Sequence, residues 1–371
     1  MGVARTLHAT AEVPLNQGDL DQAKKLYEQA LSISRQIGDR RGVEHEMGNI
    51  GLIYAHQGNQ ASAEKIYRES ISVSREIGDK PALAVHLGNL GDLLHSQGRF
   101  ADALASYNSA LELAREVGHK LSISVDLQEM GDVLADQGNL DAAMKNYSEA
   151  LAIQKEIGSR SYYAGTLAPM GNVLRHKGDA AGAKKAYEEA LSIRQQLGEK
   201  GTYADTQLAL AQLECDAGHG AEAEPLIRAA MLELHVAKET ELEIRAAALL
   251  SNSLLQQAKL PEARKTIADA LKLTAKSHNV TIRLPLAISN AYARAAMKDF
   301  TGAERLAADA LAEATKLNYI PMEFEASLAL GAIEMQASDA AGRDRLVKLE
   351  KAAKSRHFEL IGRKAAAAAK A

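Results

Sequence analysis

Three glycines in a short stretch are the first residues whose spacing could carry chemistry. The segment MGNIGLIYAHQGN, residues 47–59, contains Gly48, Gly51 and Gly58, as a phosphate-cradling loop would. Such a loop needs its glycines between a strand and a helix N-terminus, and it does not recur along a chain. Here the Gln-Gly pair at 57–58 recurs forty residues earlier and then twice more at forty-residue steps. We therefore assign these glycines to a repeated structural unit.

Other residues with chemical potential form no convincing catalytic or metal site. The stretch HEMGN at 45–49 begins like the zinc-binding pattern H-E-x-x-H, but Asn49 stands where the second histidine belongs. The eleven histidines are scattered over several repeats. The one cysteine, Cys215, has no histidine at a spacing that would activate it as a nucleophile. We expect no metal, no cofactor and no enzymatic activity.

Composition narrows the class of protein. Hydrophobic residues make up 46% of the 371 residues but aromatic residues only 4%, so the apolar residues are mainly the helix formers alanine and leucine. The net charge of −4, without a basic cluster, argues against a nucleic-acid partner. No stretch of about 18 apolar residues is present, which argues against a membrane span. A single cysteine suits a reducing compartment, so we expect a cytoplasmic protein.

The forty-residue period contains two helices. Apolar and small residues recur at helical spacing over about 41–57 and again over about 60–77. Gly58 stands where the first helix should end, and Asn59 can cap the start of the second. Pro81 falls in the first turn of the following helix, where its missing N–H is harmless. Each period therefore predicts a helix-turn-helix unit.

The spacing of small residues identifies the kind of repeat. Gly51, Ala63 and Ser70 recur one period later as glycine, alanine and alanine, with a tyrosine such as Tyr67 between the last two. This pattern resembles the tetratricopeptide repeat in the extended form found in Pins-type adaptors, kinesin light chains and bacterial signalling regulators. The resemblance implies an all-α, right-handed superhelical solenoid of about nine repeats over residues 1–360. The repeats start near residues 1, 41, 81, 121, 161, 201, 241, 281 and 321, repeats 6–9 are degenerate, and residues 361–371 form an Ala/Lys-rich helical tail.

The N-terminal repeat shows no capping sequence. Residues 2–10 read like a first helix from the middle of an array, and Pro14 is expected to shorten or bend that helix. Two hypotheses follow: the chain is cut from a longer protein, or its uncapped first repeat associates with another copy.

The resemblance implies that a groove formed by the first helix of each repeat is the functional surface. Gly48 has two open explanations, close approach of a bound chain or tolerance of glycine inside a stable array. Asn49, Asn89 and Asn172 match asparagines that hydrogen-bond the main chain of an extended peptide in similar families. The candidate groove residues are Gly48, Asn49, Leu52, His56, Asn89, Asp92, His95, Glu129, Asp132, Asp136, Asn172, Arg175, His176, Gln212 and Asn252.

The charges of this groove suggest a complementary partner. It is acidic in repeats 3 and 4 and partly basic at Arg175 and His176. A peptide with a cationic group at one end and an acidic group near Arg175 would fit, whereas the alternative is that these charges only keep the groove solvated. Two functions remain: a non-catalytic scaffold that binds an extended peptide segment of a partner protein, or a ligand- or peptide-sensing module of a larger bacterial signalling or transcription regulator.

Overall fold

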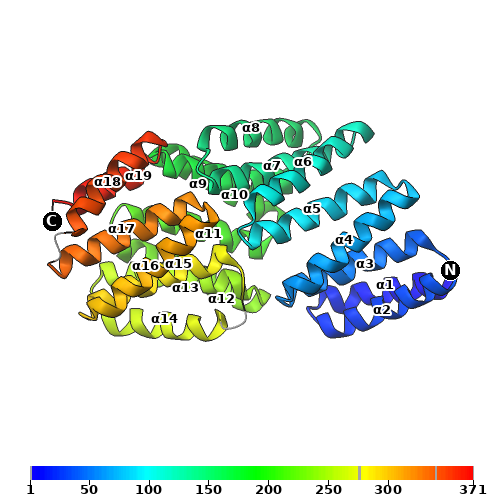
Figure 1. The fold of residues 1–371 in the computed structure, drawn as a ribbon, viewed down its shortest axis with the longest axis horizontal. Coiled ribbons are helices and arrows are strands. Elements are labelled where there is room, and N and C mark those ends of the chain that lie inside the picture. Colours follow the sequence, from blue (N-terminus) through cyan, green and yellow to red (C-terminus); the bar gives the residue numbers. More distant parts are fainter. Residues whose placement is uncertain (1, 275–276, 339–340, 371) are drawn as a thin grey trace. The chain divides into compact units, whose positions relative to one another are not determined.

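The computed structural model describes residues 2–274, 277–338 and 341–370. Within these ranges the regular secondary structure is entirely helical, and short turns join the helices (Figure 1). The predicted all-α repeat architecture is confirmed, because consecutive helices pair as the first and second helix of each forty-residue repeat. The helices are α1 (Gly2–Asn16), α2 (Leu20–Gln36), α3 (Arg40–His56), α4 (Gln60–Ile77), α5 (Lys80–Ser96), α6 (Phe100–Val117), α7 (Lys120–Asp136), α8 (Leu140–Glu156), α9 (Arg160–His176), α10 (Ala180–Leu197), α11 (Lys200–Asp216), α12 (Gly220–Ala237), α13 (Thr240–Gln256), α14 (Leu260–Thr274), α15 (Val280–Ala296), α16 (Phe300–Leu317), α17 (Ile320–Gln336), α18 (Ala341–Ser355) and α19 (Glu359–Ala368).

The chain divides into two compact units, and each is described by itself. Unit 1 ends at Met130 and unit 2 begins at Gly131, so the boundary falls inside α7. Unit 1 therefore contains the first three repeats and the beginning of the fourth.

Short turns end and restart the helices as the sequence predicts. Gly58 adopts a left-handed φ of 73°, and the Asn59 side chain accepts a hydrogen bond from the Ser62 N–H at 3.3 Å. In the degenerate repeats the same turn is kept without glycine, since Ala258 and Lys298 have φ values of 58° and 65°. A side chain in this conformation costs free energy, so the surrounding repeat packing must hold the turn there.

The small residue on the packed face of each first helix makes room for the tyrosine of the second helix. A Cβ atom on Gly91 would lie 2.6 Å from Cε1 of Tyr107, and one on Gly131 would lie 2.5 Å from Cε1 of Tyr147. Both tyrosine side chains are almost completely buried. These glycines therefore let the second helix of the same repeat approach the first closely.

Two glycines of α5, three residues apart, should respond to alanine in opposite directions. Gly91→Ala should lower the free energy of unfolding by about 2 kcal/mol, because the added methyl group collides with the buried Tyr107 ring. Gly88→Ala should raise it by up to about 1 kcal/mol, because nothing lies within 4 Å of the new Cβ and alanine favours the helix. Urea unfolding followed by circular dichroism measures both, and changes of the same sign would contradict this account of the two sites.

Pro14 does not shorten the first helix, so the expectation of an early helix end was wrong. Helix α1 continues through Pro14 to Asn16. Proline lacks the N–H that would bond the Thr10 carbonyl, so one hydrogen bond of the helix is lost there, but the helix continues for two more residues. Its carbonyl accepts hydrogen bonds from the N–H groups of Gln17 at 3.2 Å and Asp19 at 2.8 Å, which form the turn into α2.

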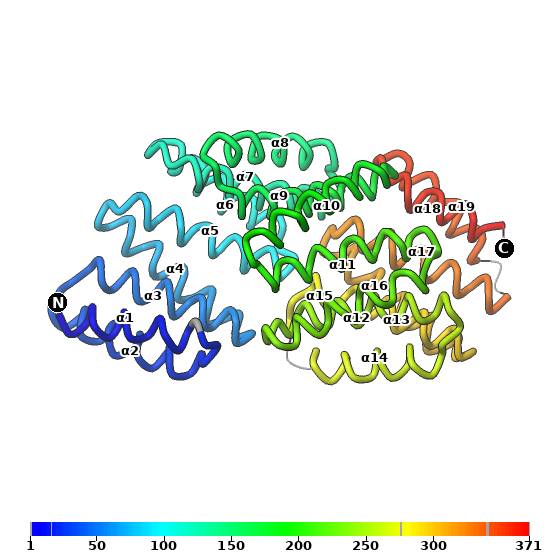
Figure 2. Tube along the Cα trace, turned by 180° about the vertical axis from the view of Figure 1, so that it is seen from behind, coloured from blue at the N-terminus to red at the C-terminus, as the bar shows by residue number. Residues whose placement is uncertain are grey.

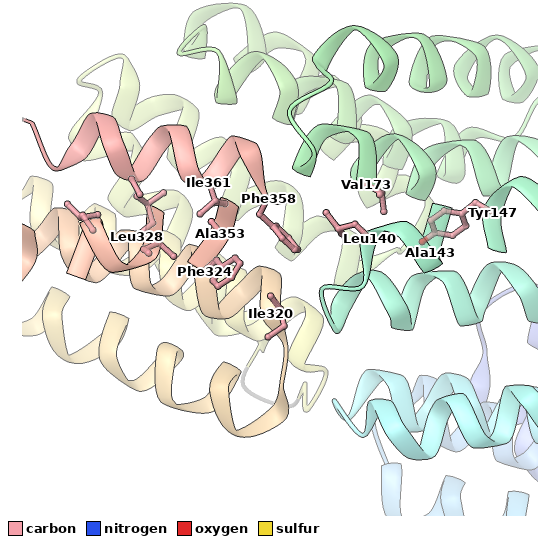
Figure 3. Close-up of a cluster of buried hydrophobic side chains, with 13 residues drawn as sticks. Leu140, Ala143, Tyr147, Val173, Ile320, Phe324, Leu328, Ala353, Phe358 and Ile361 are labelled. Carbon is pink, nitrogen blue, oxygen red and sulfur yellow. The ribbon is translucent and has the colours of Figure 1, made fainter. Parts of the chain in front are cut away.

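Unit 2 curves until its last helices contact its first ones. Helix α19 contacts α9, and both views of the fold place α19 beside α9 (Figures 1 and 2). A buried apolar cluster joins the two ends (Figure 3). The members of this closing cluster shown as labelled sticks are Leu140, Ala143, Tyr147, Val173, Ile320, Phe324, Leu328, Ala353, Phe358 and Ile361.

The expected C-terminal tail is mostly part of α19. This helix begins two residues before the tail was expected to start, directly after Phe358, which is completely buried. Ile361 and Ala365 of α19 are also completely buried in the closing cluster. The alanine-rich end of the chain thus contributes core side chains to unit 2.

Candidate functional site

Within each unit, the first helices of the repeats line one face, which we call the A-helix face of that unit. It is formed by α3, α5 and the part of α7 up to Met130 in unit 1, and by α9, α11, α13, α15 and α17 in unit 2. Neighbouring first helices contact each other within each unit, as α3 does with α5 and α13 with α15. Within each unit the repeat stack therefore bends toward this face, which makes it the candidate site.

In unit 1, two asparagines at the same place in successive repeats present free amides on this face. Asn49 and Asn89 are each half-buried, and within the described part of the chain neither side chain forms a hydrogen bond. Leu52 lies half-buried beside Asn49 on α3, and His56 is exposed in the last turn of the same helix. Each amide offers a donor and an acceptor to whatever approaches the face.

Buried tyrosines of the second helices donate hydrogen bonds to polar residues of the first helices. The Tyr107 hydroxyl donates to Asp92 Oδ1 at 2.7 Å, and the same pairing recurs as Tyr147 to Asp132 at 2.6 Å and Tyr187 to Asn172 at 2.7 Å. These hydrogen-bonded pairs were not expected from the sequence. A polar residue fifteen positions before each of the three was the signal that would have revealed the pairs.

Gly48 is explained by packing within the chain. A Cβ atom on Gly48 would lie 2.5 Å from Cε1 of His86, whose ring comes from α5 of the next repeat. His86 is buried, and burial lowers its pKa to about 4, so the ring is neutral at pH 7. The close approach that Gly48 permits is therefore that of a neutral histidine of the same protein.

Asp126 is a polar residue of the site that the sequence reasoning missed. It lies on α7, is only 6% exposed, and its Oδ2 has no hydrogen-bond partner among the described residues. Burial, and then the charge of Asp92, raise the pKa of Asp126 to about 7. No sequence pattern marks this repeat position as buried, so the burial of Asp126 is seen only in the folded structure.

In unit 2 the expected basic end of the groove is engaged by the chain's own C-terminal helix. Arg175 Nη1 lies 2.7 Å from Asp216 Oδ2, and Lys364 Nζ of α19 lies 2.7 Å from Asp216 Oδ1. Gln212 donates to the same carboxylate at 3.0 Å. Burial alone would raise the pKa of Asp216, but Arg175 and Lys364 hold it at about 2. This carboxylate therefore stays ionised and joins α9, α11 and α19.

His176 is also enclosed by this C-terminal closure. Its side chain is buried, and its ring centroid lies 5.2 Å from that of Phe358. Burial and the nearby Arg175 charge lower the pKa of His176, so the ring is uncharged at neutral pH. The structure thus places Arg175 and His176 against the C-terminal segment that includes α19.

The residues of the expected acidic cluster are divided between the two units, so the structure does not bring them together as one site. Asp92 and Glu129 belong to unit 1, and Asp132 and Asp136 belong to unit 2. All but Asp92 are half-buried. Of the remaining candidates, His95 is half-buried with its ring centroid 5.6 Å from that of Phe100, and Asn252 has a buried Oδ1 without a hydrogen-bond partner among the described residues.

The Cys215 thiol is poorly suited to nucleophilic chemistry. It is 6% exposed, and burial, followed by the charge of Asp216, raises its pKa to about 12. Across the described ranges, no three His, Cys, Asp or Glu side chains converge in a way that could hold a metal ion. In the part of the chain that the structure describes, no helix has the length and apolar character needed to cross a membrane.

Stacked helix pairs with a shared polar face define a helical-repeat protein. A family model described as tetratricopeptide repeat matches residues 2–76, 45–116 and 121–196, which together make up just over half of the chain. The chain therefore belongs to the tetratricopeptide repeat family. The predicted resemblance is confirmed, and a comparison with curated proteins finds no match.

Solved structures share the fold at low sequence identity. A Rap protein complexed with Competence and Sporulation Factor aligns over 95% of this chain and 99% of its own, with a TM-score of 0.67 and 14% identity. Apo RapI aligns over 74% of this chain and 98% of its own, with a TM-score of 0.61 and 14% identity. A signal-transduction ATPase with a tetratricopeptide repeat sensor from Pyrococcus horikoshii aligns over 96% of this chain but 48% of its own, with a TM-score of 0.51 and 16% identity.

Proposed function

We propose that this protein is a non-catalytic interaction scaffold whose A-helix face in unit 1 binds an extended segment of a partner protein. The observation that carries the proposal is the pair of unpaired amides, Asn49 and Asn89, at equivalent places of successive repeats. The high pKa and burial of Cys215 favour a non-catalytic role. A cytoplasmic location, expected from the single cysteine, is part of the same proposal.

The spacing of the amides suits a main chain that runs across the repeats. Packed helices lie about 9 Å apart, and an extended chain advances about 3.3 Å per residue. Amides on successive first helices would therefore meet peptide groups about three residues apart. Hydrogen bonds to main-chain groups would hold the segment, and side chains on the A-helix face would select its sequence.

Peptide-bound relatives support this proposal at the level of the fold. Two of the similar solved structures are described as complexes, one with Competence and Sporulation Factor and one, a Rap conjugation gene regulator of plasmid pLS20, with the Phr* peptide. These ligands belong to those proteins. For this chain we propose capture of an extended segment by first-helix side chains.

Removing both amides should weaken partner capture. We expect the Asn49→Ala/Asn89→Ala variant to retain at least tenfold less partner from the native host's extract than the wild type does. The reason is that the variant loses two amides, each of which contributes about 1 kcal/mol of hydrogen bonding. Quantitative mass spectrometry of immobilised full-length protein measures the retained partners.

The matched control is Asn108→Ala on α6, which removes an exposed asparagine from a second helix. It should retain partners like the wild type. Equal retention by all three proteins, with circular dichroism showing normal folding, would overturn the assignment of the A-helix face.

A further inference from the structure

A cavity of unit 1 opens between the first two repeats, and we call it the junction cavity. Its volume is about 340 Å³, within the range of roughly 300 to 1,000 Å³ that small-molecule sites occupy. Residues of α2 and α4, the second helices of these repeats, line it together with residues of α3. Gly48, Asn49, Leu52 and His56 of α3 do not line it, so the junction cavity is separate from the proposed partner site.

Two valines explain why the cavity is present at this junction. Val43 of α3 and Val73 of α4 line it, and both are buried. One repeat later the same two positions hold leucine, and two repeats later they hold isoleucine. Each valine is one methylene shorter than these residues, so less side-chain volume fills the space between the helices. Met47, which is 2% exposed, completes an apolar lining.

Two oppositely charged side chains of the lining have no partner within the described part of the chain. Arg35 of α2 is exposed and Glu69 of α4 is half-buried, and neither forms an ion pair or a side-chain hydrogen bond there. The other two charged lining residues, Arg40 and Glu76, pair with each other. Among the described residues, the junction cavity therefore offers one unpaired cation and one unpaired anion.

The lining also contains a buried hydroxyl without a partner. Ser34 is 1% exposed, and its Oγ forms no hydrogen bond to any described residue. The equivalent serine of the next repeat, Ser74, donates to Glu44, whereas the residue of α1 that corresponds to Glu44 is Ala4. A buried hydroxyl that no protein group satisfies is expected to bond to whatever fills the space beside it. The cavity thus suits an occupant that is partly polar and partly apolar.

We propose that the junction cavity binds a free α-amino acid with an aliphatic side chain, such as leucine or methionine. Its carboxylate pairs with Arg35, whose guanidinium can bind both carboxylate oxygens, and its ammonium group pairs with Glu69. Its side chain packs on Val43, Met47 and Val73. A zwitterion satisfies both unpaired charges at once, whereas a simple anion or cation would leave one of them unmatched. This small-molecule site goes beyond the proposed function and does not depend on it.

Isothermal titration calorimetry of the full-length protein tests the ligand class. We expect L-leucine or L-methionine to bind with one molecule per chain. N-acetyl-leucine, which lacks the ammonium group, and leucinamide, which lacks the carboxylate, should each bind at least tenfold more weakly. L-glutamate should also bind at least tenfold more weakly, because its side chain would place a charge on the apolar lining. Binding of neither leucine nor methionine, or equal binding of either leucine derivative, would overturn the proposal.

Substitutions that fill the cavity test its location. The Val43→Leu/Val73→Leu variant introduces the residues that the next repeat has at both positions, so it should fold normally and lose binding of the amino acid. Circular dichroism and the melting temperature check the fold. Unchanged binding by a correctly folded variant would overturn the assignment of the ligand to this cavity.

The two charges are tested by substitutions that leave the fold of the free protein intact. Arg35→Gln and Glu69→Gln should each weaken amino-acid binding at least tenfold. Glu112→Gln, at an exposed glutamate of α6 that does not line the cavity, is the matched control and should bind like the wild type. Wild-type affinity in both Arg35→Gln and Glu69→Gln would overturn the proposed pairing.

The partner site and the junction cavity can be distinguished in the same titration. Because no partner protein is present, the Asn49→Ala/Asn89→Ala variant should bind the amino acid like the wild type. Loss of amino-acid binding in this variant, with its fold intact, would overturn the separate location of the ligand. Failure of the amino acid to bind the wild type would sink this inference and leave the proposed function standing.

Discussion

Replacing Phe358 with alanine is expected to lower the free energy of unfolding of unit 2 by about 4 kcal/mol. Phe358 is completely buried, and its ring meets Phe324 edge-on at a centroid distance of 5.3 Å and His176 at 5.2 Å. These contacts join α19 to α17 and α9, so truncation leaves a cavity where the two ends of unit 2 meet (Figure 3). Hydrogen exchange measured by mass spectrometry should show faster exchange in α9 and α19.

The control for Phe358 is an apolar residue outside the closing cluster. Val347 of α18 is 39% exposed, and Val347→Ala should leave exchange in α9 and α19 unchanged. A loss of less than about 1 kcal/mol for Phe358→Ala would mean that the contact of α19 with α9 contributes little to the fold of unit 2.

Removing the Asp216 carboxylate should lower the free energy of unfolding by about 3 kcal/mol, because two cations lose their shared partner in a mostly buried setting. The Asp216 side chain is 6% exposed and that of Arg175 13%, and both ion pairs to the carboxylate measure 2.7 Å. Asp216→Ala leaves Arg175 and Lys364 facing each other without the carboxylate that they share, and Glu325 of α17 remains as the nearby negative charge. Urea unfolding at pH 7 measures the difference between variant and wild type.

This loss should depend on pH in a defined direction. The folded pKa of Asp216, about 2, lies below the ordinary aspartate pKa of 3.8, so folding favours its ionised form. The resulting contribution, about 2 kcal/mol, is fully present above pH 4 and disappears as pH falls through about 2. The exposed pair of Asp141 with Lys177 is the control, and Asp141→Ala should change stability little at any pH. A pH-independent cost for Asp216→Ala would contradict the ion-pair account.

The local structure of this chain could be predicted from its sequence because the residues that determine each turn and each helix contact lie close together in the chain. Gly58 and Asn59 define a turn by their conformational and hydrogen-bonding properties. Gly91 makes room for Tyr107, and Gly51, Gly131 and Gly171 do the same for the equivalent tyrosines. These are contacts between residues less than one period apart. Repetition of the pattern then makes the helix-turn-helix assignment secure.

Contacts that depend on how the stack curves could not be predicted. The meeting of Phe358 with His176, and of Lys364 with Asp216, joins segments more than 140 residues apart whose sequences contain no shared pattern. Asp126 was missed for a related reason, because its burial depends on the neighbouring repeat. Candidate groove residues on α9 were chosen by repeat position, and the position says nothing about the C-terminal helix that covers them.

Site-specific photo-crosslinking from the A-helix face tests the central claim most directly. A benzophenone amino acid replaces Leu52, which lies beside Asn49 on α3, and in a second protein it replaces Asn108 on the outer α6. After irradiation in the native host's extract, mass spectrometry identifies the crosslinked residues. The account predicts a crosslink from position 52 to one short segment of a partner and none from position 108. Crosslinks to that partner from position 108 and not from position 52 would contradict it.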